Sequence, residues 1–167
     1  EDFDLFKMGM AYILTMRGIP QVYYGTEILM SNPGTDAHGV IRSDFPGGWN
    51  NDTINAFTGK GLSEKQREAR HFLRKLLNWR KSKSCIHTGD LVHFNPVDDV
   101  YVYFRYNDEE MVMVVLNKND TVAKPDMSRF TAITDDALQG TDVISNETYK
   151  LTELVVPARS ALVLELK

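Results

Sequence analysis

Side chains that could carry chemistry are concentrated between residues 27 and 52. They are Glu27, Asp36, His38, Arg42, Asp44, Trp49 and Asp52. Most of them fall within residues 31–62, which are rich in Gly, Asn, Asp, Ser and Pro and show little hydrophobic periodicity. A connection this long inside a compact domain is usually either functional or disordered, and loops after the strands of α/β folds hold many ligand sites. The alternative is an ordinary surface loop that is polar because it meets water.

Two kinds of chemistry suit these residues. An exposed indole at Trp49 would give a stacking surface for a sugar, whereas packing against Phe45 or Phe57 is the alternative. Glycoside hydrolysis requires two carboxyls roughly 5 to 9.5 Å apart, one protonated and one ionised. Asp36 and Asp44 are nominal candidates for such a pair, but their spacing in the sequence does not fix the distance between them.

Other catalytic and metal-binding patterns are absent from the sequence. The four histidines, His38, His71, His87 and His93, are too scattered for a metal motif such as H-E-x-x-H. Cys85 is the single cysteine, so it has no partner for a disulfide or a cysteine-based metal site. Neither a G-x-S-x-G element nor a phosphate-binding P-loop occurs. We therefore expect no metal or other cofactor in this chain.

The composition also limits the partners. Nineteen Lys and Arg residues stand against 23 Asp and Glu residues, which gives a net charge of -4, and no long run carries one sign. A protein that follows nucleic-acid phosphates would be more basic, so we expect no nucleic-acid partner. No segment approaches the roughly 18 consecutive apolar residues of a membrane-spanning helix, so we expect no membrane partner.

The first half of the chain predicts an αβ arrangement. Apolar residues lie on nearly every side of 4–17, which predicts a buried helix with Asp2 or Asp4 as its N-terminal cap. The apolar run 19–24 ends at Gly25 and is typical of a parallel strand covered on both faces. The capping box Ser63-x-x-Gln66 begins a second helix that runs to about residue 82.

From residue 86 onward the hydrophobic period falls toward two, which predicts an antiparallel β-sandwich. Residues 100–106 and 111–117 flank a four-residue connection, so we expect a hairpin there. Further strands are predicted at 86–94, 129–133, 141–144, 147–151, 154–156 and 160–166. The aromatic side chains of 100–106 could form a carbohydrate platform, and the alternative is that they belong to the sandwich core.

Two segments carry a family resemblance. Residues 17–27 read Arg-Gly-Ile-Pro-Gln-Val-Tyr-Tyr-Gly-Thr-Glu and resemble the eighth barrel strand of the α-amylase superfamily, glycoside hydrolase family thirteen. Asp36 and the run Arg-Ser-Asp-Phe-Pro-Gly-Gly-Trp at 42–49 resemble the following loop of its neopullulanase and cyclomaltodextrinase-type members. The resemblance implies that 1–83 are the last helix-strand-helix part of a (β/α)8 TIM barrel. Residues 84–167 would then be the antiparallel C-terminal β-sandwich.

The resemblance also implies an activity for an intact member. Such a protein would be a retaining α-glucan glycoside hydrolase acting on starch, pullulan or maltooligosaccharides, with an Asp, a Glu and a second Asp on barrel strands four, five and seven. The chain starts at Glu1 without an initiator Met, as if inside a longer polypeptide, and these carboxylates would all precede it. We therefore expect no catalytic residue here and no activity from this chain alone. Any calcium site would also lie upstream, and the expected partners are α-glucan oligosaccharides and the remainder of the barrel.

Five site residues are expected to bind substrate. By the resemblance, Asp36 and Arg42 match positions that contact glucose units on the non-reducing side of the cleaved bond, and Tyr24 and Glu27 match positions that shape the barrel mouth. Trp49 is added from its residue type and setting alone. The alternative function is a non-catalytic glucan-binding or structural β-sandwich module whose helical segment docks to a partner.

Overall fold

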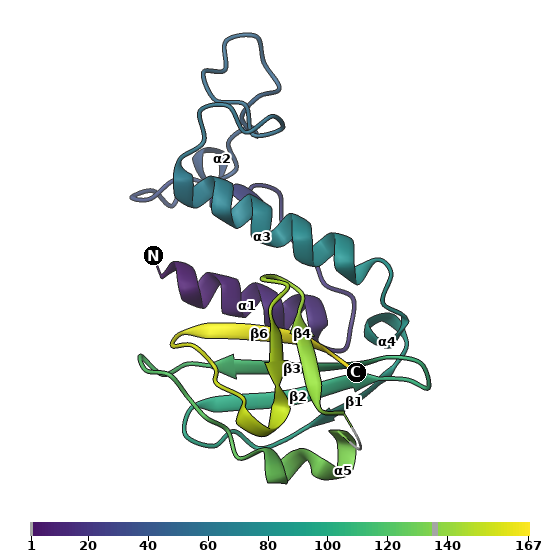
Figure 1. Cartoon of the computed structure of the whole chain (residues 1–167). Helices are drawn as coiled ribbons and strands as arrows, with labels where there is room; N and C mark the ends of the chain where they lie inside the picture. Colours follow the sequence, from purple (N-terminus) through teal and green to yellow (C-terminus); the bar gives the residue numbers. More distant parts are fainter. Residues whose placement is uncertain (1, 135–136) are drawn as a thin grey trace. The chain divides into compact units, whose positions relative to one another are not determined.

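The computed structural model describes residues 2–134 and 137–167 and divides into two compact units (Figure 1). The sheet unit comprises the chain up to Pro20 together with Lys75–Lys167, and the loop unit is Gln21–Arg74. The predicted domains 1–83 and 84–167 concern an intact barrel enzyme and stay a prediction.

The sheet unit contains one six-stranded sheet in which every neighbouring pair is antiparallel. Its strands are β1 (Asp90–His93), β2 (Val100–Tyr106), β3 (Met111–Asn117), β4 (Gln139–Asp142), β5 (Thr148–Lys150) and β6 (Ser160–Leu166), in the order β1-β2-β3-β6-β4-β5. The predicted hairpin is confirmed with both of its strand bounds. Its connection is closed by the Asn107 amide, which donates to the Glu110 carbonyl at 3.0 Å.

One face of this sheet carries the main hydrophobic core. Alternate residues of the three central strands, such as Phe104, Met113 and Leu164, are fully buried there against Phe130. Three short helices contribute side chains to this core. They are η2 (Met127–Phe130), α5 (Thr131–Thr134) and η3 (Leu151–Glu153). The β-branched and aromatic residues of β2 and β3 therefore form a core, and the carbohydrate platform considered for 100–106 is wrong for buried Tyr103 and Phe104.

Two predicted strands are not strands in the structure. Residues 129–133 lie in η2 and α5, because Asp126 starts a helical turn by accepting the Ser128 amide at 3.0 Å. Residues 154–156 follow η3 and hold only the isolated bridge between Ala123 and Val156. Within the described residues, helices and loops thus accompany a single sheet.

The other face of the sheet contacts α1 (Phe3–Thr15). Asp2 caps this helix as predicted, since its carboxylate accepts the amides of Asp4 and Leu5 at 3.1 and 3.0 Å. The hydroxyls of Thr15 and Tyr103 are hydrogen bonded at 2.6 Å, which joins the end of α1 to β2. The helix is covered on one side only, because Leu5 and Ile13 are exposed.

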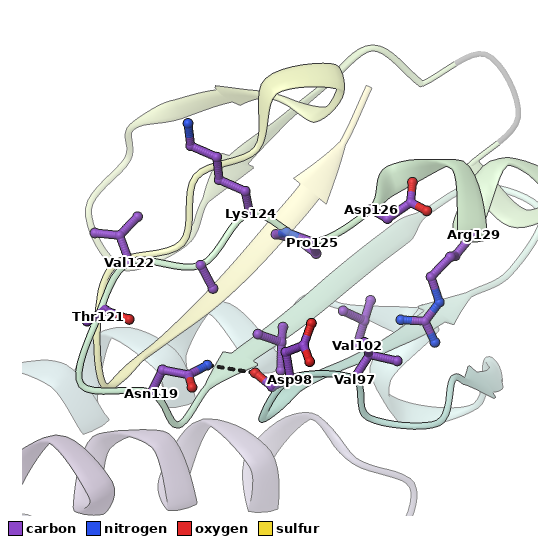
Figure 2. Close-up of a pocket in the computed structure, with 12 residues that line it drawn as sticks. Val97, Asp98, Val102, Asn119, Thr121, Val122, Lys124, Pro125, Asp126 and Arg129 are labelled. Carbon is purple, nitrogen blue, oxygen red and sulfur yellow. Dashed lines mark hydrogen bonds between the residues drawn. The ribbon is translucent and has the colours of Figure 1, made fainter.

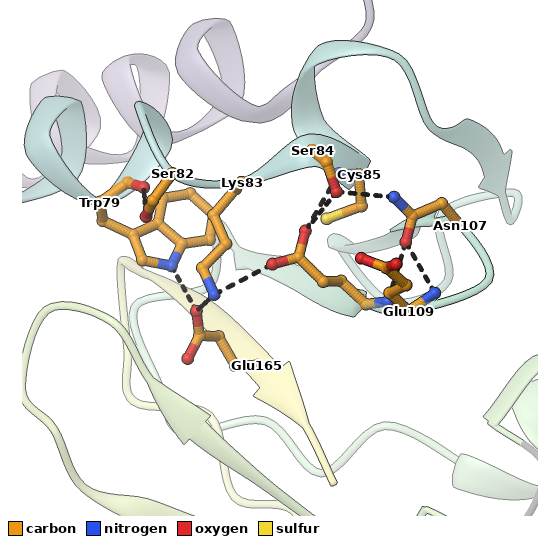
Figure 3. Close-up of polar contacts among 9 residues, drawn as sticks. Trp79, Ser82, Lys83, Ser84, Cys85, Asn107, Glu109 and Glu165 are labelled. Atoms are coloured by element: carbon orange, nitrogen blue, oxygen red, sulfur yellow. Dashed lines mark hydrogen bonds and ion pairs between the residues drawn. The ribbon is translucent and has the colours of Figure 1, made fainter.

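The predicted strand 86–94 begins later than expected. Ser84–His87 form the short helix α4, and β1 occupies only Asp90–His93. The Glu110 carboxylate explains this difference because it accepts the Ser84 hydroxyl at 2.9 Å and the Cys85 amide at 3.2 Å (Figure 3). These bonds satisfy donors at the start of α4 from the neighbouring hairpin.

Between residues 19 and 80, the helix prediction is confirmed and the strand prediction is wrong. The helix α3 (Glu64–Arg80) starts at the predicted capping box, in which the Ser63 amide donates to Gln66 Oε1 at 3.0 Å and the Gln66 amide donates to Ser63 Oγ at 3.2 Å. Residues 19–24 have no strand pairing, and Ile19 is 99% exposed. A parallel strand needs neighbouring strands to satisfy its backbone groups, and the described part of the chain contains only antiparallel pairs.

Candidate functional site

All five predicted binding residues lie in the loop unit. Tyr24 precedes Gly25, whose backbone has φ 85° and starts the short helix η1 (Thr26–Ile28). A Cβ at Gly25 would approach Met30 Cβ and Sδ to 2.8 Å, so both the space and the backbone conformation require glycine there. This sharp turn sets the position of Tyr24 relative to the chain that follows.

Hydrogen bonds bring Tyr24 together with the segment around Arg42. The Tyr24 hydroxyl donates to the Ser43 carbonyl at 3.1 Å. The Asn32 side-chain amide donates to the Val40 carbonyl at 2.7 Å and to Ser43 Oγ at 3.0 Å. Asn32 was not identified from the sequence as a site residue, although its place before Pro33 marked a turn.

The phenol of Tyr24 stays neutral at ordinary pH. Desolvation raises its pKa, and Tyr23, whose ring lies 4.7 Å away between centroids, raises it further. The nearby charges of Asp44 and Arg42 act in opposite directions on this pKa. The electrostatic coupling shows that the predicted residues Tyr24 and Arg42 share one environment with Asp44.

Three predicted residues offer free polar groups. Asp36 and Arg42 are exposed on either side of the short helix α2 (His38–Ile41), and Glu27 is half-buried in η1. Within residues 2–134 and 137–167, none of these three side chains forms a hydrogen bond or ion pair. They are therefore available to a ligand, while the structure leaves their roles as predictions.

Trp49 is exposed and is held at two points. Its indole N–H donates to Asp44 Oδ2 at 3.1 Å, and its backbone amide donates to Asp52 Oδ2 at 3.0 Å. Asp52 also accepts the Gly47 amide at 2.6 Å, and these backbone bonds lower the pKa of its carboxyl. Asp44 and Asp52 thus act as structural acceptors here, which the sequence did not reveal.

The alternative in which Trp49 packs on a neighbouring phenylalanine is not what the structure contains. Phe45 and Phe57 pack against each other edge to face, with centroids 5.1 Å apart. Trp49 remains 67% exposed. Packing within the hydrophobic core of the loop therefore does not explain why a tryptophan stands at position 49.

The loop that carries Trp49 is ordered by Asn55. The Asn55 amide donates to the Lys60 carbonyl at 2.8 Å, and Asn55 Oδ1 accepts the Thr58 amide at 2.9 Å. Gly47, at φ 109°, lies so close to Asn55 that a Cβ would come within 2.8 Å of it. A small core of Ile28, Ala56 and Leu62, with Met30 and Phe45 beside it, supports these turns.

A separate hollow lies in the sheet unit (Figure 2). Its volume is about 350 Å³, and its lining includes Val97, Val102 and Pro125 with the polar residues Asn119 and Arg129. The Asn119 side-chain amide donates to the Asp98 carbonyl at 2.7 Å, and Arg129 donates to the Asn95 carbonyl at 2.9 Å. Because both polar groups serve the surrounding loops, this hollow is a weaker candidate than the loop unit.

In the described ranges 2–134 and 137–167, no three His, Cys, Asp or Glu side chains gather closely enough to hold a metal ion. Among these same residues, no helix has the length and apolar character needed to span a bilayer.

Comparison with known proteins finds a family match over the C-terminal part of the chain. Residues 91–165 match the family described as the Cyclo-malto-dextrinase C-terminal domain. A cyclomaltodextrin glucanotransferase of Klebsiella oxytoca is 29% identical over 113 residues, which cover 68% of this chain but only 16% of that relative.

Solved structures share the fold over nearly the whole chain. AmyP in complex with maltotriose superposes with a TM-score of 0.72 at 15% identity, covering 99% of this chain and 35% of AmyP. The α-amylase of Geobacillus thermoleovorans complexed with acarbose gives a TM-score of 0.68 at 20% identity, covering 99% and 33%. These solved structures share the fold of the chain, and residues 91–165 match the cyclomaltodextrinase C-terminal domain family, while the chain spans only a minor part of each relative.

Proposed function

We propose that this chain is the C-terminal part of a retaining α-glucan glycoside hydrolase that acts on starch, pullulan or maltooligosaccharides. The observation that carries the proposal is the cyclomaltodextrinase-type domain at residues 91–165, in the same chain as the strand-eight motif at 17–27. Relatives of the chain include a cyclomaltodextrin glucanotransferase, and similar folds have been solved with maltotriose and acarbose. The catalytic carboxylates lie upstream, and any calcium site lies there too.

In this proposal, residues 1–83 complete a barrel and residues 84–167 form the C-terminal β-sandwich domain. α1 is barrel helix seven, and 19–24 becomes the eighth strand when neighbouring parallel strands supply backbone partners. The complete exposure of Ile19 and the exposed apolar side of α1, which includes Ile13, support an origin in a larger hydrophobic assembly.

Asp36 and Arg42 bind glucosyl hydroxyls on the non-reducing side of the cleaved bond. A carboxylate accepts such hydrogen bonds, and a guanidinium donates several from one planar group. Both side chains are exposed and unengaged within the described residues, which supports their use by a ligand. Tyr24 and Glu27 shape the mouth of the site, and the bond between Tyr24 and the Ser43 carbonyl places Arg42 beside it.

The test is a kinetic assay of the intact protein on maltoheptaose, starch and pullulan. We expect hydrolysis with retention at the anomeric carbon, and no hydrolysis by the 167-residue chain alone. Binding of maltoheptaose without any hydrolysis by the intact protein would instead favour the non-catalytic glucan-binding module.

Arg42 provides the residue-level test of the same proposal. Arg42→Ala removes several donors to the sugar, so we expect kcat/KM on maltoheptaose to fall by about tenfold or more. Arg74→Ala is the matched control because Arg74 is also an exposed arginine of the loop unit, on α3, without a predicted role. Equal kinetics of the two variants would remove Arg42 from the site.

A further inference from the structure

Trp49 combines a high exposure with a fixed position. The residue is 67% exposed, yet its indole N–H is bonded to Asp44 and its backbone amide to Asp52. Fixing an exposed indole costs side-chain entropy, which hydrogen bonds at two points offset. A ring held in this way loses little further freedom when a ligand covers its face, so it is preorganised for binding.

Exposure alone would not distinguish Trp49. Phe57 of the same loop is 64% exposed, but one side of its ring packs edge to face on Phe45. The Trp49 indole has no such ring partner among the described residues, and its N–H is bonded to Asp44. An indole stacks on the C–H surface of a sugar ring through its broad faces, and the high exposure of Trp49 leaves room for such a contact.

A hollow adjoins the same anchoring group. It measures about 300 Å³, and its lining combines apolar side chains such as Ile28, Met30 and Ile54 with the polar residues Ser31, Ser43, Asp44 and Gln66. Ligand pockets span roughly 300 to 1,000 Å³, so this one fits a single small ring better than a long oligosaccharide. Asp44 connects the two features because it lines the hollow and also accepts the indole N–H.

The polar groups of the hollow can serve sugar hydroxyls. Asp44 uses Oδ2 for Trp49, so Oδ1 is left to accept a hydroxyl hydrogen bond. Gln66 uses Oε1 for the Ser63 amide, so its side-chain NH₂ is left as a donor. An apolar floor with a few such donors and acceptors recognises a neutral polyhydroxylated ring better than a charged ligand.

We propose that Trp49 and the hollow beside Asp44 form a binding subsite for one glucosyl unit of an α-glucan, with Trp49 stacking on the sugar and Asp44 positioning the indole. This inference rests on the proposed function, since it names a further contact for the same class of substrate. Asp44 has two roles in this subsite. Its Oδ2 accepts the indole N–H of Trp49, and its Oδ1 accepts a hydrogen bond from the ligand.

The experiment uses the intact protein labelled with 5-fluorotryptophan and titrated with maltotriose and maltoheptaose. Trp49→Phe identifies the ¹⁹F resonance of residue 49 by its disappearance. We expect that resonance to shift with the same dissociation constant that calorimetry gives for the oligosaccharide. We expect Trp49→Ala to weaken maltoheptaose binding about tenfold and to raise KM more than it changes kcat.

Asp44 is tested by a pair of substitutions. Asp44→Ala removes the acceptor, so we expect a displaced or broadened Trp49 resonance in the free protein and weaker binding. Asp44→Asn keeps an oxygen acceptor, so it restores most of the resonance position and affinity. Phe57→Ala is the control for removing an exposed aromatic ring from this loop, and it leaves the affinity for maltoheptaose unchanged.

The outcomes separate this inference from the function on which it rests. A wild-type protein that neither binds nor cleaves maltoheptaose overturns the proposed function. A wild-type protein that binds maltoheptaose while the Trp49 resonance stays fixed overturns only the subsite. Equal affinities of Trp49→Ala and Phe57→Ala would overturn it as well.

Discussion

At the scale of single residues, Arg105 is the clearest case of a side chain that the surrounding fold requires. Its guanidinium is 1% exposed and donates to three backbone carbonyls: Nε to Asp90 at 3.2 Å, Nη1 to Thr15 at 3.0 Å and Nη2 to Gly89 at 3.1 Å. The Thr15 carbonyl ends α1, where a helix carries partial negative charge. Arg105 therefore joins the last turn of α1 to β2 and to the chain entering β1.

Replacing Arg105 by Ala should destabilise the protein by about 3 kcal/mol, because it leaves three carbonyls unsatisfied in a buried site. Arg105→Lys should recover only part of this loss, since an ammonium group cannot reach three carbonyls with the geometry of a planar fork. Urea unfolding followed by circular dichroism measures both changes. Lys150→Ala, on the exposed edge strand β5, is the control and should stay within about 0.5 kcal/mol of wild type.

At the scale of elements, sequence patterns succeeded where the signal was local. The hairpin 100–106/111–117 joins two runs of mostly apolar residues through a polar connection, and the pattern Ser63-x-x-Gln66 predicts the two capping hydrogen bonds that the structure contains. The strand prediction for residues 19–24 was wrong because a parallel strand depends on partner strands far away in sequence. For the site, the sequence left two alternatives for Trp49, an exposed ring or a ring packed on Phe45 or Phe57, and its bond to Asp44 depends on the folded path of the loop.

The polar network around Lys83 predicts how stability depends on pH. Lys83 Nζ forms ion pairs with Glu110 Oε1 at 3.4 Å and with Glu165 Oε1 at 2.5 Å (Figure 3). Glu165 Oε1 also accepts a hydrogen bond from the Trp79 indole N–H at 2.6 Å. Desolvation acts to raise the pKa of Glu110, but its bonds to Cys85, Ser84 and Lys83 outweigh this effect and lower it. The same balance, with Lys83 and Trp79 as partners, lowers the pKa of Glu165.

A carboxyl with a lowered pKa in the folded state stabilises the protein above its unfolded pKa, and this contribution is lost as the pH falls through the folded value. We therefore expect the melting temperature to fall as the pH is lowered below about 4.5. Glu110→Gln should lower the melting temperature at pH 7 and reduce this acid dependence. A melting curve for Glu110→Gln that runs parallel to wild type from pH 7 to pH 3 would contradict the assignment.

At the scale of the whole molecule, exposed apolar side chains are the main unexplained feature. Leu5 and Ile13 of α1 are 41% and 44% exposed, and Val40 and Ile41 of α2 are 52% and 47% exposed. Scattered apolar residues are normal on a protein surface, but α1 presents them along a helix whose other side is already buried. In the proposed enzyme, the rest of the barrel covers this side of α1.

The 167-residue chain expressed by itself should therefore self-associate. Leu5 and Ile13 lie on α1 but outside its buried set, so Leu5→Lys with Ile13→Lys should raise solubility and shift the chain toward monomer without unfolding the sheet. Light scattering after size exclusion measures the mass, and circular dichroism reports the sheet. A control with two lysines at Thr148 and Glu153, both exposed in the sheet unit, should leave the association unchanged. A wild-type chain that is monomeric and monodisperse at high concentration would show that the exposed side of α1 needs no covering partner.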